Sequence, residues 1–422
     1  MVNRLKKLNP QFRNILRLSS KLAKQSGYHI YLVGGVVRDL LLDRPVFDLD
    51  LVVEGDAIPL VRRIAKQLKE DFRRHHSFGT ATLYHHGHKI DFATARKELY
   101  PHPGSLPKVK KSSLKNDLAR RDFAINAMAI SVNKNNYGQL IDFYHGRQDL
   151  KNGLIRILYP ESFLDDSLRI LRAIRFQQRF SFKIEAKTYR LMKQAIGAGA
   201  LGWVNPHRLR DELILFLNEA NPYRYIKKFY LLERFNFINK RIKLNKDSFK
   251  FFIRAQAAIR FYNKRFKDKK EIKPWLIFLT GILLNLSHRE VTEVVARFGF
   301  KKDERVTISL IKKDLTKIKK LDKNIKPSVI YKILAGYSHE AIIFFYAYFP
   351  KKRIRSNIAF FLKKLSDQKL KIKGKDLQKI GVESSVFMGK TLKKIFYLKL
   401  DKNLKTKRQE LNEAKTIVKK KR

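Results

Sequence analysis

Two aspartates one residue apart lie in the stretch GGVVRDLLLDRPVFDLDLV, residues 34–52. If FDLDLVV forms a strand, Asp48 and Asp50 project from the same face at a spacing of about 6.6 Å. Two carboxylates held this close repel each other unless a cation lies between them, which favours a divalent-metal site. Because Mg²⁺ prefers oxygen ligands and bridges carboxylates to substrate phosphates, the pair predicts magnesium-dependent chemistry on a phosphate.

The same stretch begins with a glycine pair. Gly34 and Gly35 allow the backbone to approach a phosphate closely, and Arg38 brings a suitable charge at the start of the helix that should follow. A glycine pair alone, or an aspartate pair alone, is common in proteins as a plain turn or a solvated strand edge. Together and at this spacing, they indicate a nucleoside triphosphate site.

A third carboxylate, Asp91, lies within the apolar segment HKIDFATAR. This segment has the alternating pattern of a strand, so Asp91 should be partly buried in a sheet. A buried aspartate without a partner is costly, which favours a functional role. Asp91 is therefore the candidate to complete a catalytic set with Asp48 and Asp50.

The elements that position these residues form a small mixed head. YHIYLVGG predicts a strand and a glycine turn, VVRDLLL a short helix, residues 57–71 a longer helix, and TATLYHHGHKIDFATA a hairpin that turns near Gly87. From about residue 160 the strand patterns stop, and amphipathic helices follow with breaks at four prolines. The expected fold class is α+β, with an all-helical second part. The prolines are Pro206, Pro222, Pro274 and Pro327.

Composition narrows the choice of partners. The 422 residues include 92 Lys+Arg against 38 Asp+Glu, a formal net charge of +54, which predicts a polyanionic partner and favours nucleic acid over membrane. No cysteine is present, which excludes disulfides, thiolate catalysis and zinc–thiolate sites and fits a cytoplasmic location. No apolar run reaches the roughly 18 residues of a membrane span. The basic N-terminal segment resembles a transit peptide, but its helical apolar spacing favours a packed helix.

Five segments together carry a family resemblance: LVGGVVRDLLLDRPVFDLDLVV, FGTATL, IDFATARKELYPHPGSLPKV, RRDFAINAMAI and DDSLRILRAIRF. In this order, over roughly residues 28–215, the chain resembles the class II tRNA nucleotidyltransferases and bacterial poly(A) polymerases of the polymerase-β-like superfamily. The resemblance implies a catalytic head at residues 1–155, a helical neck at 156–220 that reads the nucleotide, and a helical body with a basic tail at 221–422.

The resemblance also implies roles in RRDFAINAMAI. Arg121 and Asp122 would contact the triphosphate and the ribose, and Asn126, four residues further along a helix face, would support them. From the residues alone, Asp122 could equally be the N-cap of a helix. Both roles are compatible, because a capped helix end also binds phosphate.

In FLDDSLRILRAIRF, Asp166 and Arg169 stand at i and i+3, which from spacing alone predicts an exposed ion pair on one helix face. By resemblance the pair acts as a protein template, although Asp165 stands where many family members have Glu. Cytosine and adenine each offer an amine next to a ring acceptor, which Asp166 and Arg169 would match; uracil and guanine do not. Arg172 and Arg175 continue at the same spacing and could hold phosphates or form a solvated face.

The activity implied is template-independent addition of CCA, or part of it such as the terminal A, to the 3′ end of tRNA. ATP and possibly CTP would be the substrates, with two Mg²⁺ ions, release of pyrophosphate, and a tail that grips the acceptor and T arms. Two alternatives remain: a poly(A) polymerase, although its Gly-Arg-Arg-Phe pattern is missing before FGTATL, and a non-catalytic RNA-binding protein. Residues 97–118 are expected to form a flexible loop. The sequence specifies neither the nucleotides added nor the oligomeric state.

Overall fold

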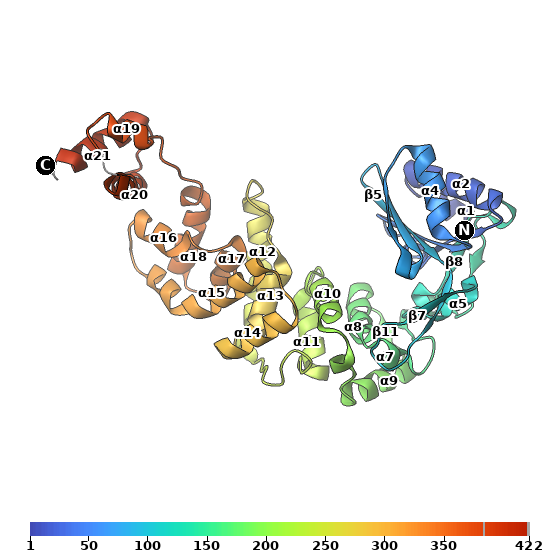
Figure 1. Cartoon of the computed structure of the whole chain (residues 1–422). Coiled ribbons are helices and arrows are strands. Elements are labelled where there is room, and N and C mark those ends of the chain that lie inside the picture. Colours follow the sequence, from blue (N-terminus) through green and yellow to red (C-terminus); the bar gives the residue numbers. More distant parts are fainter. Residues whose placement is uncertain (383–384, 420–422) are drawn as a thin grey trace. The chain divides into compact units, whose positions relative to one another are not determined.

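The computed structural model describes residues 1–382 and 385–419. Its chain divides into two compact units, Met1–Phe216 and Leu217–Arg422 (Figure 1). The first unit combines a sheet with helices, and the described part of the second contains helices and no strand, which confirms the predicted α+β class. The boundary at residue 216 lies near the predicted end of the neck; the finer division into head, neck, body and tail stays a prediction.

A seven-stranded mixed sheet organises the first unit. Its order is β3-β4-β5-β2-β1-β8-β9, and only the β2–β5 pair is parallel. This parallel register places Asp50 directly opposite Asp91. The strands are β1 (His29–Val33), β2 (Leu49–Glu54), β3 (Phe72–His75), β4 (Thr80–His85), β5 (His88–Thr94), β8 (Ala129–Ser131) and β9 (Leu140–Ile141).

The sequence pattern explains the central strands and their helices. In β2 the side chains of Leu49, Leu51, Val52 and Val53 are buried while Asp50 is exposed, so the strand turns one polar position outward. The predicted strands, short helix and hairpin are confirmed, except that β2 begins after Asp48. The helices are α1 (Val2–Leu5), α2 (Pro10–Gln25), α3 (Gly35–Leu41) and α4 (Ala57–Leu68). Because α2 packs on β1 and α4, the basic N-terminal segment is the packed helix that its spacing predicted.

The expected loop at residues 97–118 is wrong in part. The segment contains the two-stranded antiparallel sheet of β6 (Arg96–Leu99) and β7 (Lys108–Lys111), followed by α5 (Leu114–Ala119). Residues 100–107, between the two strands, form no helix or strand. The hydroxyl of Ser113 caps α5 by accepting from the Asn116 backbone N–H.

The rest of the first unit is mainly helical. The prediction that strands stop at residue 160 is wrong in one detail, because the short strands β10 (Leu154–Ile155) and β11 (Lys183–Ile184) pair in parallel. The expected continuous helix over residues 163–176 is also broken, since the backbone of Asp166 is extended (φ −135°, ψ 91°). The helices are α6 (Gly146–Asn152), α7 (Ser162–Asp165), α8 (Leu168–Phe180), α9 (Ala186–Gly197) and α10 (Pro206–Leu217).

Helices make up the second unit around an aromatic core. Phe251 and Phe252 of α12 pack against Phe344 of α17 and Phe278 of α13. Most of the apolar residues of α17 are buried in this core. The helices are α11 (Pro222–Glu233), α12 (Lys246–Arg265), α13 (Pro274–Ile282), α14 (His288–Arg297), α15 (Lys302–Ile318), α16 (Pro327–Leu334), α17 (His339–Tyr348), α18 (Lys352–Phe360), α19 (Gly374–Gln378), α20 (Ser385–Lys402) and α21 (Lys407–Lys419).

Each of the four prolines predicted to break the helical part begins a helix. They open α10, α11, α13 and α16, where the missing N–H costs no hydrogen bond. Across residues 1–382 and 385–419, no helix is long and apolar enough to cross a membrane.

Candidate active site

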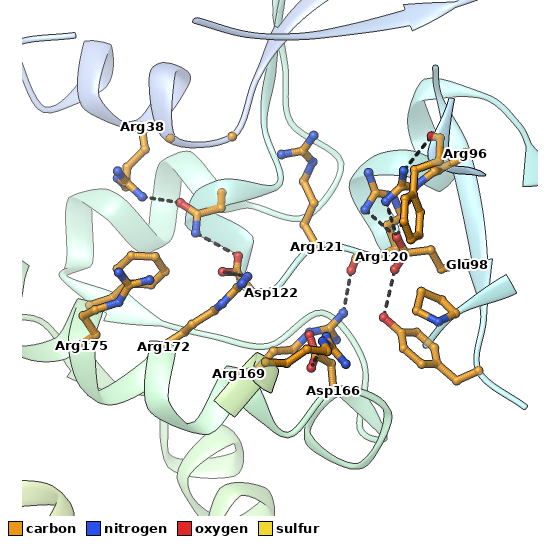
Figure 2. A pocket seen from close by; sticks show the side chains of 18 of the residues that line it. Arg38, Arg96, Glu98, Arg120, Arg121, Asp122, Asp166, Arg169, Arg172 and Arg175 are labelled. Carbon is orange, nitrogen blue, oxygen red and sulfur yellow. Dashed lines mark hydrogen bonds and ion pairs between the residues drawn. The ribbon is translucent and has the colours of Figure 1, made fainter. Parts of the chain in front are cut away.

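A pocket of about 540 Å³ lies in the first unit (Figure 2). Nine arginines line it against only three acidic residues, Glu98, Asp122 and Asp166, so the pocket favours an anionic ligand. Every residue that the sequence predicted to bind nucleotide is part of the lining. These residues are Gly34, Gly35, Arg38, Arg121, Asp122, Asn126, Asp166, Arg169, Arg172 and Arg175.

The glycine turn at Gly34 lies next to the guanidinium of Arg121. Gly34 has φ +70°, and a Cβ at this position would lie 2.7 Å from Nη1 of Arg121. A side chain here would therefore strain the backbone and displace the guanidinium. At Gly35 the nearest atom to an added Cβ is Nη2 of Arg38, at 3.4 Å. Both glycines thus allow arginines to lie close over the backbone, and the close approach of a phosphate to this turn stays a prediction.

A hydrogen-bonded chain runs from α3 to Asp122. Nη1 of Arg38 donates to Oδ1 of Asn126 (2.7 Å), and Nδ2 of Asn126 donates to Oδ1 of Asp122 (2.9 Å), as Figure 2 shows. Arg38 is itself held by Asp39 (Nη2 to Oδ2, 2.9 Å) and lies over the ring of Phe180 at 4.8 Å. Arg38 therefore fixes Asn126, and Asn126 fixes Asp122.

The segment that carries Asp122 and Asn126 is not the α-helix that the sequence suggested. Residues Ala124–Asn126 form a single 3₁₀ turn whose N-cap is Phe123, so the N-cap reading of Asp122 is wrong. Asp122 instead accepts from the backbone N–H of the next residue, Phe123 (2.9 Å). The predicted contact between Asp122 and Asn126 forms nevertheless, because one turn of 3₁₀ geometry also brings the two residues together.

Arg121 is held by a fully buried carboxylate. Oδ2 of Asp117 accepts from Nη2 of Arg121 (3.0 Å), and its Oδ1 accepts from Nη2 of Arg120 (2.7 Å). Burial works to raise the pKa of Asp117, but the charges of Arg121 and Arg120 outweigh it and keep that pKa below its ordinary value. Asp117 therefore stays ionised and fixes both guanidinium groups.

The three predicted catalytic carboxylates lie on two neighbouring strands or directly before one of them, outside the pocket lining. Asp50 in β2 faces Asp91 in β5, and Asp48 immediately precedes β2. Desolvation by the surrounding protein and the charges of Asp91 and Asp48 raise the pKa of the Asp50 carboxyl, while Arg121 and Lys89 oppose the shift. Arg121 thus lines the pocket and also interacts electrostatically with the Asp50 carboxylate.

Asp91 already has protein partners. Its Oδ1 accepts from Oγ1 of Thr82 (2.6 Å), and its Oδ2 pairs with the ammonium of Lys89. In the described ranges, no group of three or more histidine, aspartate and glutamate side chains is arranged to hold a metal ion. The metal prediction therefore depends on Asp48 and Asp50, with Asp91 as their neighbour.

Asp166 and Arg169 line the same pocket but do not pair with each other. Oδ1 of Asp166 accepts from Nη2 of Arg208 on α10 (3.1 Å). Arg169 donates to the hydroxyl of Tyr159 (3.0 Å) and to the backbone carbonyl of Arg120 (2.6 Å). The predicted shared helix face is wrong because α7 ends before Asp166, and only Arg169 lies in α8.

Arg172 and Arg175 do not form a solvated helix face. Both contact the buried Glu212 of α10, Arg172 through Nε (3.1 Å) and Arg175 through Nη2 (2.9 Å). Arg172 also lies 3.7 Å from Oδ2 of Asp122. The two arginines therefore connect α8 to α10 and extend the positive lining of the pocket.

The chain is similar to known proteins over most of its length. Residues 30–156 match the family model described as the poly A polymerase head domain. A solved CCA-adding enzyme in an apo form superposes with a TM-score of 0.81 at 34% identity, covering 97% of this chain and 96% of that one. The CCA-adding enzyme of Thermotoga maritima, complexed with tRNA, gives a TM-score of 0.77 at 33% identity over 98% and 97% of the two chains. The chain belongs to the tRNA nucleotidyltransferase family.

Two curated members of the family are longer than this chain. The A-adding tRNA nucleotidyltransferase of Aquifex aeolicus is 36% identical over 358 residues, which are 84% of this chain and 43% of that protein. The enzyme of the same name from Geobacter sulfurreducens is 30% identical over 408 residues, or 95% and 46%. The chain thus spans less than half the length of these two relatives.

The first unit of this tRNA nucleotidyltransferase family member contains pocket residues that the sequence reasoning missed. Arg96, Glu98 and Tyr100 alternate along one strand face, and Glu98 accepts from Nη2 of Arg96 (3.0 Å) and from the Tyr100 hydroxyl (2.9 Å). This two-residue spacing is typical of a strand and could have predicted that the three side chains share one face. It was overlooked because residues 97–118 were expected to form a loop. The other lining residues are Phe78, Leu106, Pro107, Arg120, Phe176, Arg179 and Arg208.

Proposed function

We propose that this chain adds nucleotides to the 3′ end of tRNA, with ATP or CTP as substrate and pyrophosphate as the second product. The observation that carries the proposal is the arginine-lined pocket whose Arg121 also interacts with Asp50. Solved CCA-adding enzymes in complex with ATP (32% identity, TM-score 0.79) and with CTP (33%, 0.79) support these substrates.

Magnesium is the proposed cofactor, and Asp48 and Asp50 are the residues that would hold it. The donors are hard carboxylate oxygens. Desolvation is the main cause of the raised pKa of Asp50, and the charges of Asp91 and Asp48 add to it, so a cation bound there would favour the ionised carboxylate. Bound there, Mg²⁺ would supply charge neutralisation at the phosphates and a lower pKa for the RNA 3′-hydroxyl. Asp91, which accepts from the Thr82 hydroxyl, would be the third catalytic carboxylate, on the side of the attacking 3′-hydroxyl.

Triphosphate binding is assigned to the arginines and the glycine turn. Arg121 lies over the Gly34 backbone and keeps its position through Asp117. A phosphate at this turn would meet a guanidinium whose orientation is already fixed, which lowers the entropy cost of binding. The chain from Arg38 through Asn126 presents Asp122 to the pocket, where its carboxylate can accept from a ribose hydroxyl.

Base selection is assigned to Asp166 and Arg169. Asp166 can accept from the amine of adenine or cytosine, and Arg169 can donate to the adjacent ring nitrogen. The contacts of Arg169 with Tyr159 and the Arg120 carbonyl hold its guanidinium in one orientation. Uracil or guanine would leave polar groups unpaired at about 1–3 kcal/mol each. Arg208, which contacts Asp166, would orient that carboxylate.

The test uses tRNA transcripts that end at the discriminator base, at one added C, or at two. Each is incubated with Mg²⁺ and with ATP, CTP or both, and the products are resolved on a sequencing gel. Full CCA on the shortest transcript would identify a complete CCA-adding enzyme, and a single A on the two-C transcript without use of CTP would identify an A-adding enzyme. Long A tails on unrelated RNA would instead favour poly(A) polymerase. No incorporation into any transcript would refute the enzymatic proposal.

A further inference from the structure

A second pocket, of about 460 Å³, lies within the helical unit, outside the proposed active site. It is formed by the end of α12, the end of α17 and α18, which Figure 1 labels. Aromatic rings and basic side chains line it, and no acidic residue does. This composition suits a ligand that combines a flat ring with a negative charge.

The aromatic part of this pocket is a stack. Phe261 of α12 and Tyr346 of α17 lie with ring centroids 5.1 Å apart and planes within 5° of parallel. Phe360, the last residue of α18, lines the same pocket and is 39% exposed. An exposed aromatic ring next to an ordered stack offers a surface on which a further flat ring can stack.

The charged part centres on Arg355 of α18. Its guanidinium lies 4.3 Å from the ring centroid of Tyr346, which fixes its plane. Its Nε is buried and has no hydrogen-bond partner among the residues that the structure describes. Arg265, Lys352 and Lys363 add positive charge to the same lining. A buried donor without a partner is costly, and an anion in the pocket would satisfy it.

We propose that this pocket binds one unpaired nucleotide of the RNA substrate, with its base against Phe360 and its phosphate at Arg355. A base inside a duplex has both faces covered by its neighbours, whereas an unpaired base has a free face that can stack on a protein ring. The combination of aromatic rings and arginine therefore favours a single-stranded or looped nucleotide over a duplex backbone. The inference rests on the proposed function only in taking RNA as the substrate.

The experiment uses the full chain and a tRNA transcript in which 4-thiouridine replaces uridine at random. After irradiation, cross-linked peptides and nucleotides are mapped by mass spectrometry for the parent, Phe360→Leu, Arg355→Gln and Arg353→Gln. Arg353 is the matched control, because it is an exposed arginine on α18 that does not line the pocket. We expect cross-links from unpaired positions to peptides within residues 261–266 or 346–363, lost in the two pocket variants and kept in Arg353→Gln.

Affinity provides a second readout. Phe360→Leu should weaken tRNA binding by roughly 5- to 10-fold, as expected for a lost base–aromatic stack, and Arg353→Gln should weaken it less. Cross-links that reach these peptides only from paired positions, or that persist in both pocket variants, would overturn the proposal. So would labelling of the pocket by 8-azido-ATP that excess ATP prevents, since the ligand would then be a free nucleotide. Because no readout needs catalysis, failure of the enzymatic proposal would be recognised separately.

Discussion

At the scale of single residues, Asp50 allows the most direct test of the proposed metal site. Its carboxylate faces Asp91 across the β2–β5 register, and the charges of Asp91 and Asp48 help to raise its pKa. Asp50→Asn keeps the shape and removes the charge that would bind Mg²⁺. We expect nucleotide incorporation into tRNA to fall at least about 100-fold, because charge neutralisation at the phosphates would be lost. Incorporation is measured with tRNA, ATP and Mg²⁺ at saturation.

The control for this change is Asp71→Asn, which removes an exposed carboxylate elsewhere in the first unit. The Asp71→Asn variant should incorporate nucleotide within about twofold of the parent rate, since surface substitutions usually change stability little. EDTA should stop the reaction of the parent and excess Mg²⁺ should restore it. If Asp50→Asn kept more than a tenth of the parent rate, Asp50 could not be a metal ligand.

Gly34 allows a matched test of the phosphate site. Gly34 and Gly27 share a positive φ, 70° and 71°, but only at Gly34 would a Cβ meet Arg121. Alanine at either position should cost about 1 kcal/mol of stability through backbone strain. Only Gly34→Ala should also raise the KM for ATP, by about tenfold or more, because it displaces the guanidinium. Equal KM values in the two variants would argue against a phosphate at this turn.

At the scale of elements, the sequence predicted best what local patterns determine. Apolar alternation predicted β1, β2 and β5, and the prolines predicted where four helices begin. The break between α7 and α8 was missed because nothing in DDSLRIL forbids a helix. The extended backbone at Asp166 is accompanied by tertiary contacts, among them the Arg208 pair and the anchoring of Arg169 by Tyr159 and Arg120. Such contacts come from distant parts of the chain and leave no local pattern.

The end of α11 carries a buried carboxyl that should make stability depend on pH. Glu233 accepts from the Phe237 backbone N–H (3.1 Å), but desolvation raises its pKa from 4.5 to about 7. In the unfolded chain Glu233 ionises above pH 4.5, whereas in the folded chain it stays protonated until about pH 7. The free energy of unfolding is therefore not reduced by Glu233 below pH 4.5. As pH rises from 4.5 towards 7, the free energy of unfolding falls by at most about 3 kcal/mol.

Glu233→Gln mimics the protonated form and should remove this dependence. Its melting temperature should be close to that of the parent at pH 5 and several degrees higher at pH 8, by differential scanning fluorimetry. Glu271→Gln, which changes an exposed glutamate in the same unit, should have the melting temperature of the parent at both pH values. A parent that matches Glu233→Gln at both pH values would mean that Glu233 titrates normally in the folded chain.

At the scale of the whole molecule, the dominant property is a formal net charge of +54. A protein that neutralises several phosphates releases their counterions, so its affinity for RNA falls steeply with salt. ATP carries far fewer phosphates than tRNA, and its proposed pocket has arginines that are held by buried acids such as Asp117 and Glu212. The KM for tRNA should therefore rise much more steeply between 50 and 200 mM salt than the KM for ATP. Steady-state incorporation at each salt concentration measures both, and parallel slopes would mean that the excess charge does not serve RNA binding.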